Sequence, residues 1–254
     1  MMYILTFSFI YFIYISNMIY IQKNKDTNLP HHFDCGSAMF GAIESGQKFK
    51  LISYEDLEKG SYDALIKNNL FVGSVEFMKK VFERIGLKDV KVPKNSNRES
   101  KMITIKDAKE KASKGEFLFI KPPDIKLFTG FVLDGAIHSC LNDIPDDYKV
   151  LSYQPFESRI ESEWRVYIKN GEIYDSKNYS GDFKISPNYS YVKEVIKENV
   201  DFPCCYTIDI GILENGVNVV VEFNDMWAIG NYGMDNYEYL RLLKLRYFEI
   251  VKEK

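Results

Sequence analysis

Apolar and polar positions in residues 18–98 alternate between strand and helix periods, which predicts a small α/β domain. The predicted elements are strands at residues 18–21, 49–53 and 70–72, and helices at 37–45 and 74–86. Ser74 is expected to cap the second helix, because its hydroxyl oxygen can accept a backbone hydrogen bond in the first turn. The apolar face of that helix comprises Phe77, Met78, Val81, Phe82 and Ile85.

A linker-like stretch at residues 93–97 separates this domain from a second one, predicted over residues 99–254. Its strands are expected at residues 116–121, 149–156, 163–169, 172–177, 204–213 and 217–224, and its helices at 104–115, 187–199 and 236–251. The last helix is amphipathic, and its inward positions are Leu240, Leu243, Tyr247 and Ile250.

The stretch from Cys204 to Asn224 carries the strongest signal in the chain. Two runs rich in β-branched residues join at Asn215-Gly216, a typical hairpin turn. A two-residue turn would set Asp209 opposite Glu222 and leave the other face wholly apolar. The expected cross-strand pairs are Thr207–Asn224, Ile208–Phe223, Asp209–Glu222, Ile210–Val221 and Ile212–Val219.

Carboxylates that face each other across a hairpin have Cβ atoms about 5 Å apart and repel. Water, a proton or a cation must relieve the repulsion between Asp209 and Glu222, and Asn224 adds a neutral oxygen on the same face. Hard oxygen ligands of this kind suit magnesium, which is usually shared with substrate phosphates. The alternative is an acidic hairpin surface that faces water.

A second hairpin is predicted around Asn170-Gly171. The expected cross-strand pairs are Lys169–Glu172, Ile168–Ile173 and Arg165–Ser176. Glu163 and Arg165 then share a polar face, which allows two interpretations. One is an exposed, salt-bridged surface; the other is a cation directed at the charge that develops on a phosphate.

Lys121 ends a strand of buried type and is followed by a loop with Lys126 and Thr129-Gly130. This arrangement is consistent with a phosphate cradle, although charged residues are common at strand ends. No Walker-type glycine-rich loop occurs in the sequence.

Composition narrows the class of protein. The chain has 254 residues, 46% of them hydrophobic, which is sufficient for one large or two modest domains, and its net charge of −3 argues against nucleic-acid binding. The three histidines are too scattered for a zinc site. Cys35, Cys140, Cys204 and Cys205 lack metal-ligand spacing, and we interpret them as reduced, intracellular thiols.

Residues 1–22 carry no charge and are long enough for a membrane-spanning helix. A cleaved signal peptide fits less well, because no basic residue precedes the apolar run. We favour a third interpretation, in which residues 1–17 are an extension or unusual leader before a cytoplasmic domain that starts at Met18. A membrane anchor through residues 1–21 is the alternative.

The order of these pieces resembles the ATP-grasp superfamily, and more closely its branch from phages, viruses and bacteria that is named for an arginine and two lysines. The matching segments cover roughly residues 102–250. They are Phe-Ile-Lys121-Pro, Lys126-Leu-Phe-Thr-Gly130, Glu163-Trp-Arg165, Asn178-Tyr-Ser-Gly181-Asp182, Asp209-Ile-Gly211 and Glu222-Phe-Asn224 with its continuation to Gly233.

The resemblance implies an α+β fold in which two subdomains grip ATP, preceded by the small α/β domain. It implies that Lys121 and Arg165 act on the phosphates in catalysis, and that Asp209, Glu222 and Asn224 bind magnesium. The implied nucleotide-binding residues are Lys121, Lys126, Thr129, Gly130, Tyr153, Gln154, Phe156 and Glu163.

The reaction implied by the resemblance is the ADP-forming ligation of a carboxylate to an amine through an acyl phosphate, with small molecules or peptides as substrates. The same residues would serve a small-molecule kinase, and a membrane-tethered nucleotide-binding or interaction protein is a third alternative. The sequence departs from many family members after Asn224, where Asp225, Met226 and Trp227 replace a nearby arginine that helps to bind substrate.

Overall fold

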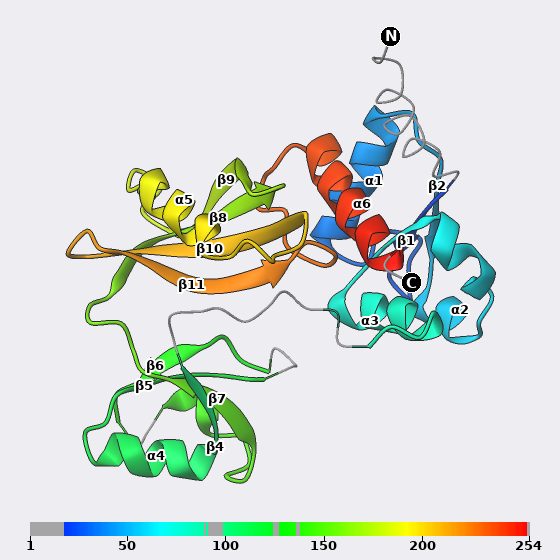
Figure 1. Ribbon diagram of the computed structural model, residues 1–254. Helices are drawn as coiled ribbons and strands as arrows, with labels where there is room; N and C mark the ends of the chain where they lie inside the picture. The colour runs from blue at the N-terminus through cyan, green and yellow to red at the C-terminus, as the bar shows by residue number, and fades with distance from the viewer. Residues whose placement is uncertain (1–17, 89, 91–98, 124–126, 136–137, 253–254) are drawn as a thin grey trace.

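The computed structural model describes residues 18–88, 90, 99–123, 127–135 and 138–252. These residues form an α+β architecture with one parallel sheet and two antiparallel sheets (Figure 1). In chain order the elements are β1 (Ile19–Gln22), α1 (Phe33–Glu44), β2 (Phe49–Ile52), α2 (Tyr54–Glu58), η2 (Asp63–Asn68), β3 (Leu70–Val72), α3 (Val75–Arg84), β4 (Ser100–Thr104), α4 (Ile105–Ser113), β5 (Leu118–Lys121), β6 (Phe131–Leu133), η3 (Ser139–Leu141), β7 (Lys149–Tyr153), β8 (Ile160–Lys169), β9 (Glu172–Gly181), α5 (Tyr189–Lys197), β10 (Cys205–Leu213), β11 (Asn218–Asp225) and α6 (Asn236–Lys252).

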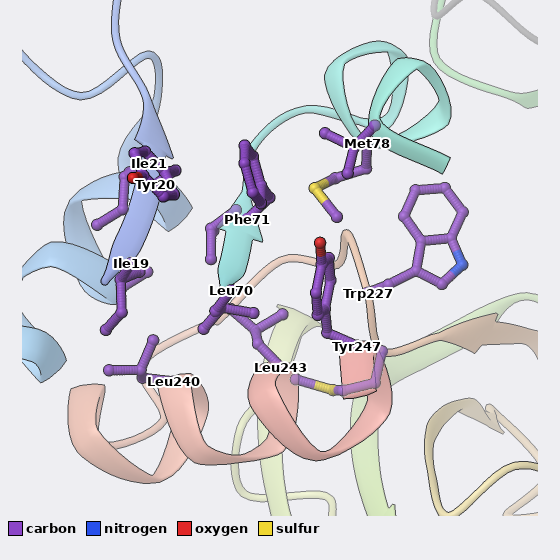
Figure 2. Packing of buried hydrophobic residues seen from close by; sticks show 14 of the residues in the cluster. Ile19, Tyr20, Ile21, Leu70, Phe71, Met78, Trp227, Leu240, Leu243 and Tyr247 are labelled. Carbon is purple, nitrogen blue, oxygen red and sulfur yellow. The ribbon is translucent and has the colours of Figure 1, made fainter. Parts of the chain in front are cut away.

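The parallel sheet has the order β2-β1-β3, and its central strand β1 is buried along its whole length, as parallel strands usually are. The last helix of the chain, α6, completes the core around this sheet. Figure 2 shows Leu240, Leu243 and Tyr247 of α6 in the same cluster as Ile19 and Phe71 of the sheet. This result confirms the predicted inward face of α6, including Ile250.

Helix α1 lies against α6 (Figure 1), and Gly41 makes this close approach possible. A Cβ at Gly41 would lie 2.3 Å from the carbonyl oxygen of Asn236, so any residue larger than glycine would clash at this position. Helix α1 begins at Phe33, four residues before the predicted start at Ser37. The added turn buries Cys35 in register with Ala38 and places Asp34 where it favours the helix dipole.

The two antiparallel sheets have the orders β4-β7-β5-β6 and β11-β10-β8-β9. Helix α4 packs on the first sheet and α5 on the second, each through its own apolar cluster. Ser74 caps α3 as predicted, and Thr104 caps α4 in a capping box with Asp107.

The acidic hairpin of β10 and β11 has the predicted register only at its open end. Thr207–Asn224, Ile208–Phe223 and Asp209–Glu222 are confirmed, whereas Ile210 pairs with Val220 and Ile212 with Asn218. The predicted pairs Ile210–Val221 and Ile212–Val219 are wrong, because the turn holds three residues between Leu213 and Val217, with Gly216 left-handed. A bulge at Val221 restores the register at the carboxylates.

In the hairpin of β8 and β9 the predicted register holds near the turn and fails farther from it. Lys169–Glu172 and Ile168–Ile173 are confirmed, but Arg165 pairs with Lys177 and not with Ser176, because the register shifts between Tyr167 and Ile168. Near its turn this hairpin keeps the two-residue Asn-Gly geometry, and both turn residues have positive φ.

The predicted linker at residues 93–97 and the predicted extension at residues 1–17 lie outside the described residues, so the predicted domain limits of 18–98 and 99–254 stay a prediction. Across the part of the chain that the structure describes, no helix combines the length and apolarity needed to cross a membrane.

A buried ion pair fastens β11 to α6. Arg246 places Nε and Nη2 each 2.7 Å from the carboxylate oxygens of Asp225, and its Nη1 lies 2.8 Å from Glu249. Glu249 in turn accepts the backbone N–H of Cys204, the residue before β10. Burial raises the pKa of Asp225, although Arg246 opposes the rise.

We predict that Arg246→Ala lowers the free energy of unfolding by about 3–5 kcal/mol, because it leaves the carboxylate of Asp225 buried without its cation. Urea denaturation measures the loss. Arg159→Ala is the control, since it removes an exposed pair with Glu214 and is expected to cause no resolvable change. Equal losses in the two variants would contradict a structural role for the buried pair.

Candidate active site

Three neighbouring strands carry the predicted charged residues in one row. Glu222 of β11 is the cross-strand partner of Asp209 of β10, which is in turn the partner of Arg165 of β8. Residues directly opposite one another project from the same face of an antiparallel sheet. The other face packs on α5 through residues such as Ile208 and Val220, so the charged row lies on the face away from α5.

Arg165 and Asp209 form a bidentate ion pair. Nε lies 2.8 Å from Oδ1 and Nη2 lies 2.7 Å from Oδ2, and the two side chains are 6% and 2% exposed. Burial raises the pKa of Asp209 to about 6, and Arg165 opposes this rise. Burial acts to lower the pKa of Arg165, but Asp209 outweighs it, so the pKa is raised. The interpretation of this surface as an exposed salt bridge is therefore wrong.

Glu222 receives its cation from the other antiparallel sheet. Lys121, the last residue of β5, places Nζ 2.9 Å from Oε2 of Glu222. Asn224 Nδ2 lies 3.1 Å from Glu222 Oε1 and 3.4 Å from Asp209 Oδ2. Burial acts to raise the pKa of Glu222, but Lys121 and Asn224 outweigh it and hold that pKa below its ordinary value. Each of the two facing carboxylates is thus balanced by one cation.

The loop after β5 returns to Lys121 at a glycine. A Cβ at Gly130 would lie 3.0 Å from Cβ of Lys121 and 2.6 Å from Cζ of Phe119, so only glycine allows this approach. Thr129, the preceding residue, is exposed. The structure therefore brings Thr129-Gly130 next to Lys121, as the predicted phosphate cradle requires. The third member of that prediction, Lys126, lies outside the described residues.

The remaining predicted nucleotide-binding residues lie on β7, after it, or on β8. The ring centroid of Tyr153 is 5.4 Å from Lys121 Nζ, and beyond β7 Gln154 is exposed and Phe156 half-buried. Glu163 Oε2 accepts a hydrogen bond of 2.6 Å from the hydroxyl of Tyr179. Their roles toward a nucleotide stay predictions.

Two tyrosines that stand in segments matching the family, but for which no role was predicted from the sequence, lie near Arg165. The ring centroids of Tyr232 and Tyr179 are 4.6 Å and 5.8 Å from Cζ of Arg165. No local pattern links these residues, because Tyr179 is on β9 and Tyr232 is in the loop after β11. They meet only once the sheet has formed.

The side-chain oxygens of Asp209, Glu222 and Asn224 could supply some, but not all, of the ligands that a hard divalent cation needs. Among the described residues, no three or more His, Cys, Asp or Glu side chains gather in a group that could hold a metal ion. Asp209, Glu222 and Asn224 offer two carboxylates and one amide, which suits magnesium if phosphate oxygens and water complete its shell.

A parallel N-terminal sheet, followed by two antiparallel sheets that bring a lysine to an arginine–carboxylate row, defines an ATP-grasp protein. Residues 96–242 match the family model for the ATP-grasp domain of family 2 in the clade named for an arginine and two lysines. The matched residues are more than half of the chain, and the chain belongs to this family.

Solved ATP-grasp structures share the fold at low sequence identity. D-alanine–D-alanine ligase from Bacillus anthracis, complexed with ATP, has a TM-score of 0.53 at 12% identity, over 93% of this chain and 98% of its own. Carboxyaminoimidazole ribonucleotide synthase from Aspergillus clavatus, also complexed with ATP, has a TM-score of 0.53 at 10% identity, over 90% of this chain and 77% of its own. No curated protein matches the chain significantly.

We predict that Gly130→Ala lowers the free energy of unfolding by about 1–3 kcal/mol, because the added methyl group displaces the loop from Phe119 and Lys121. Urea denaturation measures the change. Gly135→Ala is the matched control, since nothing lies within 4 Å of its Cβ position. A loss as large at Gly135 as at Gly130 would show that the close approach is not the cause.

Proposed function

We propose that the protein is an ATP- and magnesium-dependent, ADP-forming ligase that joins a carboxylate to an amine. One observation carries the proposal: Lys121 from one antiparallel sheet meets Glu222 from the other, beside the buried Arg165–Asp209 pair. Two cations and two carboxylates in contact supply what a magnesium–triphosphate complex needs. The cations suit its phosphate oxygens, and the carboxylates suit its metal ion.

Nucleotide binding in this proposal is an exchange of partners. Lys121 leaves Glu222 for the phosphates, and Glu222 then holds magnesium together with Asp209 and Asn224. Asn224 donates its amide nitrogen to both carboxylates, and a half-turn of the amide presents Oδ1 in the same place. Every charge keeps a partner of opposite sign before and after binding, so no buried charge is left alone.

The other proposed nucleotide contacts follow from their positions. Thr129-Gly130 lies beside Lys121 and would cover the phosphates, together with Lys126. Residues 152–156 lie at and just beyond the end of β7 and would hold the adenine, mostly through the backbone. Tyr153, Gln154, Phe156 and Glu163 complete the proposed set.

The proposed reaction has two steps. A substrate carboxylate oxygen attacks the γ-phosphorus of ATP, and the bond between this phosphorus and the oxygen that bridges it to the β-phosphate breaks. The products of this step are an acyl phosphate and ADP. An amine then attacks the acyl carbon and releases inorganic phosphate and a proton. Arg165 stabilises the negative charge on the phosphoryl group during transfer, so the catalysis depends on positioning and electrostatics and needs no covalent enzyme nucleophile.

We predict that Glu222→Gln weakens the binding of AMP-PNP in the presence of Mg²⁺ by at least about tenfold, since it removes one metal-binding charge. Isothermal titration calorimetry with and without Mg²⁺ measures this effect. Glu214→Gln changes a carboxylate that is more exposed, at the turn of the same hairpin, and is expected to bind as the wild type does. Unchanged binding by Glu222→Gln would contradict the proposed metal site.

We also predict ADP and free phosphate in equal amounts when the protein is given Mg–ATP and mixtures of amino acids and peptides. The structurally similar D-alanine–D-alanine ligase is named for a reaction between two amino acids, which makes these the first substrates to test. Coupled ADP and phosphate assays measure the products. Arg165→Met is expected to abolish turnover. A stable phosphorylated product in place of free phosphate would indicate a kinase.

A further inference from the structure

The guanidinium of Arg165 is held in its plane by Asp209, but that contact engages only one edge. Nε and Nη2 bind the two carboxylate oxygens, while Nη1 lies 3.5 Å from the carbonyl oxygen of Gly230. Rotation about the Asp209 edge therefore depends on the other groups that surround the guanidinium. The rings of Tyr232 and Tyr179, whose centroids are 4.6 Å and 5.8 Å from Cζ of Arg165, are two of these groups.

We propose that Tyr232 is a positioning residue for Arg165, together with Tyr179, whose ring centroid lies 5.8 Å from Cζ of Arg165. This inference rests on the function proposed above, in which Arg165 stabilises the transferring phosphoryl group. The ring of Tyr232 is 4.6 Å from Cζ of Arg165, and it stacks on Tyr179 at 4.8 Å with an interplanar angle of 15°. The hydroxyl of Tyr179 donates to Glu163, which fixes the second ring.

The contact between the tyrosine rings and Arg165 gains importance when magnesium and ATP are bound. In the proposed function, Asp209 shares its oxygens with magnesium, so its hold on Arg165 weakens at the moment when the guanidinium must point at the phosphates. The stacked rings bind Arg165 through the ring face, which involves neither metal nor phosphate. They are therefore the contacts that keep the guanidinium in place throughout the reaction.

The backbone conformation of Tyr232 shows that the surrounding structure determines its position. Its φ is +48°, a left-handed conformation that residues with a Cβ rarely adopt, and Gly233 follows with φ +87°. Such a conformation persists when the surroundings determine it, and it is common at functional sites. The other non-glycine residue with positive φ among the described residues is Asn170, in a hairpin turn of the kind that favours asparagine there.

Hydrogen bonds from three elements hold the loop that carries Tyr232. Tyr167 of β8 donates to the carbonyl oxygens of Gly230 and Asn231 at 2.9 and 2.6 Å, and Tyr239 of α6 donates to that of Ile229. Asp34, in the first turn of α1, accepts the backbone N–H of Asn231 at 2.7 Å. Strand β8 and helices α1 and α6 thus determine where the ring of Tyr232 lies.

The test compares the affinity for Mg–ADP with that for Mg–ADP–aluminium fluoride, which mimics the planar phosphoryl group. We expect Tyr232→Gly to weaken the fluoride complex by at least about tenfold while Mg–ADP binding changes little. The same variant should resist urea as well as or better than the wild type, because glycine adopts φ +48° without strain. Tyr232→Phe keeps the ring and should retain the wild-type affinities.

Asn170→Gly is the matched control, since it relieves the same backbone conformation far along the chain from Tyr232. It should preserve both affinities. The inference is overturned if Tyr232→Gly binds the fluoride complex as the wild type does, or if it loses both ligands and stability together, as a purely structural residue would. A wild-type protein that binds no Mg–ADP would instead overturn the proposed function.

Discussion

Two carboxylates that face each other, one buried and the other partly buried, are the constraint on which this structure depends. Asp209 and Glu222 repel, and burial makes each charge costly unless a cation accompanies it. Arg165 meets this requirement from within the same sheet. Lys121 meets it from the other antiparallel sheet, so the balance of charge is also a contact between the sheets. Ligand binding at such a place can exchange ionic partners without creating an isolated charge.

The register of the strands is adjusted locally to keep this row intact. The bulge at Val221 compensates for the longer turn at Gly216, and it keeps Val220 and Phe223 on the side of α5 while Glu222 stays opposite Asp209. A hairpin without the bulge would send Glu222 to the apolar face, because neighbouring residues of a strand alternate between faces. The irregularity therefore serves the site.

The N-terminal sheet takes part in the site through its helices. Helix α6 belongs to the core of that sheet, is fastened to β11 by Arg246 and Asp225, and holds Ile229 through Tyr239. Helix α1 reaches the same loop through Asp34. Asp225 stands where the resemblance to the family led us to expect an arginine nearby that binds substrate, and in this structure it pairs with Arg246 of α6.

The sequence by itself determined the features that depend on neighbours along the chain. These are the caps at Ser74 and Thr104, the face of α6, the places of the two Asn-Gly turns, and the two-residue geometry of the turn at Asn170-Gly171. Strand periodicity also predicted that Asp209 faces Glu222, but across the longer turn only the bulge at Val221 keeps the two residues opposite each other. Tertiary structure alone decided the bulges, the burial of Arg165, the contact of Lys121 with Glu222, and the tyrosines over the guanidinium. These features join residues from separate strands, sheets and loops, and packing and charge balance between such segments leave no local pattern in a sequence.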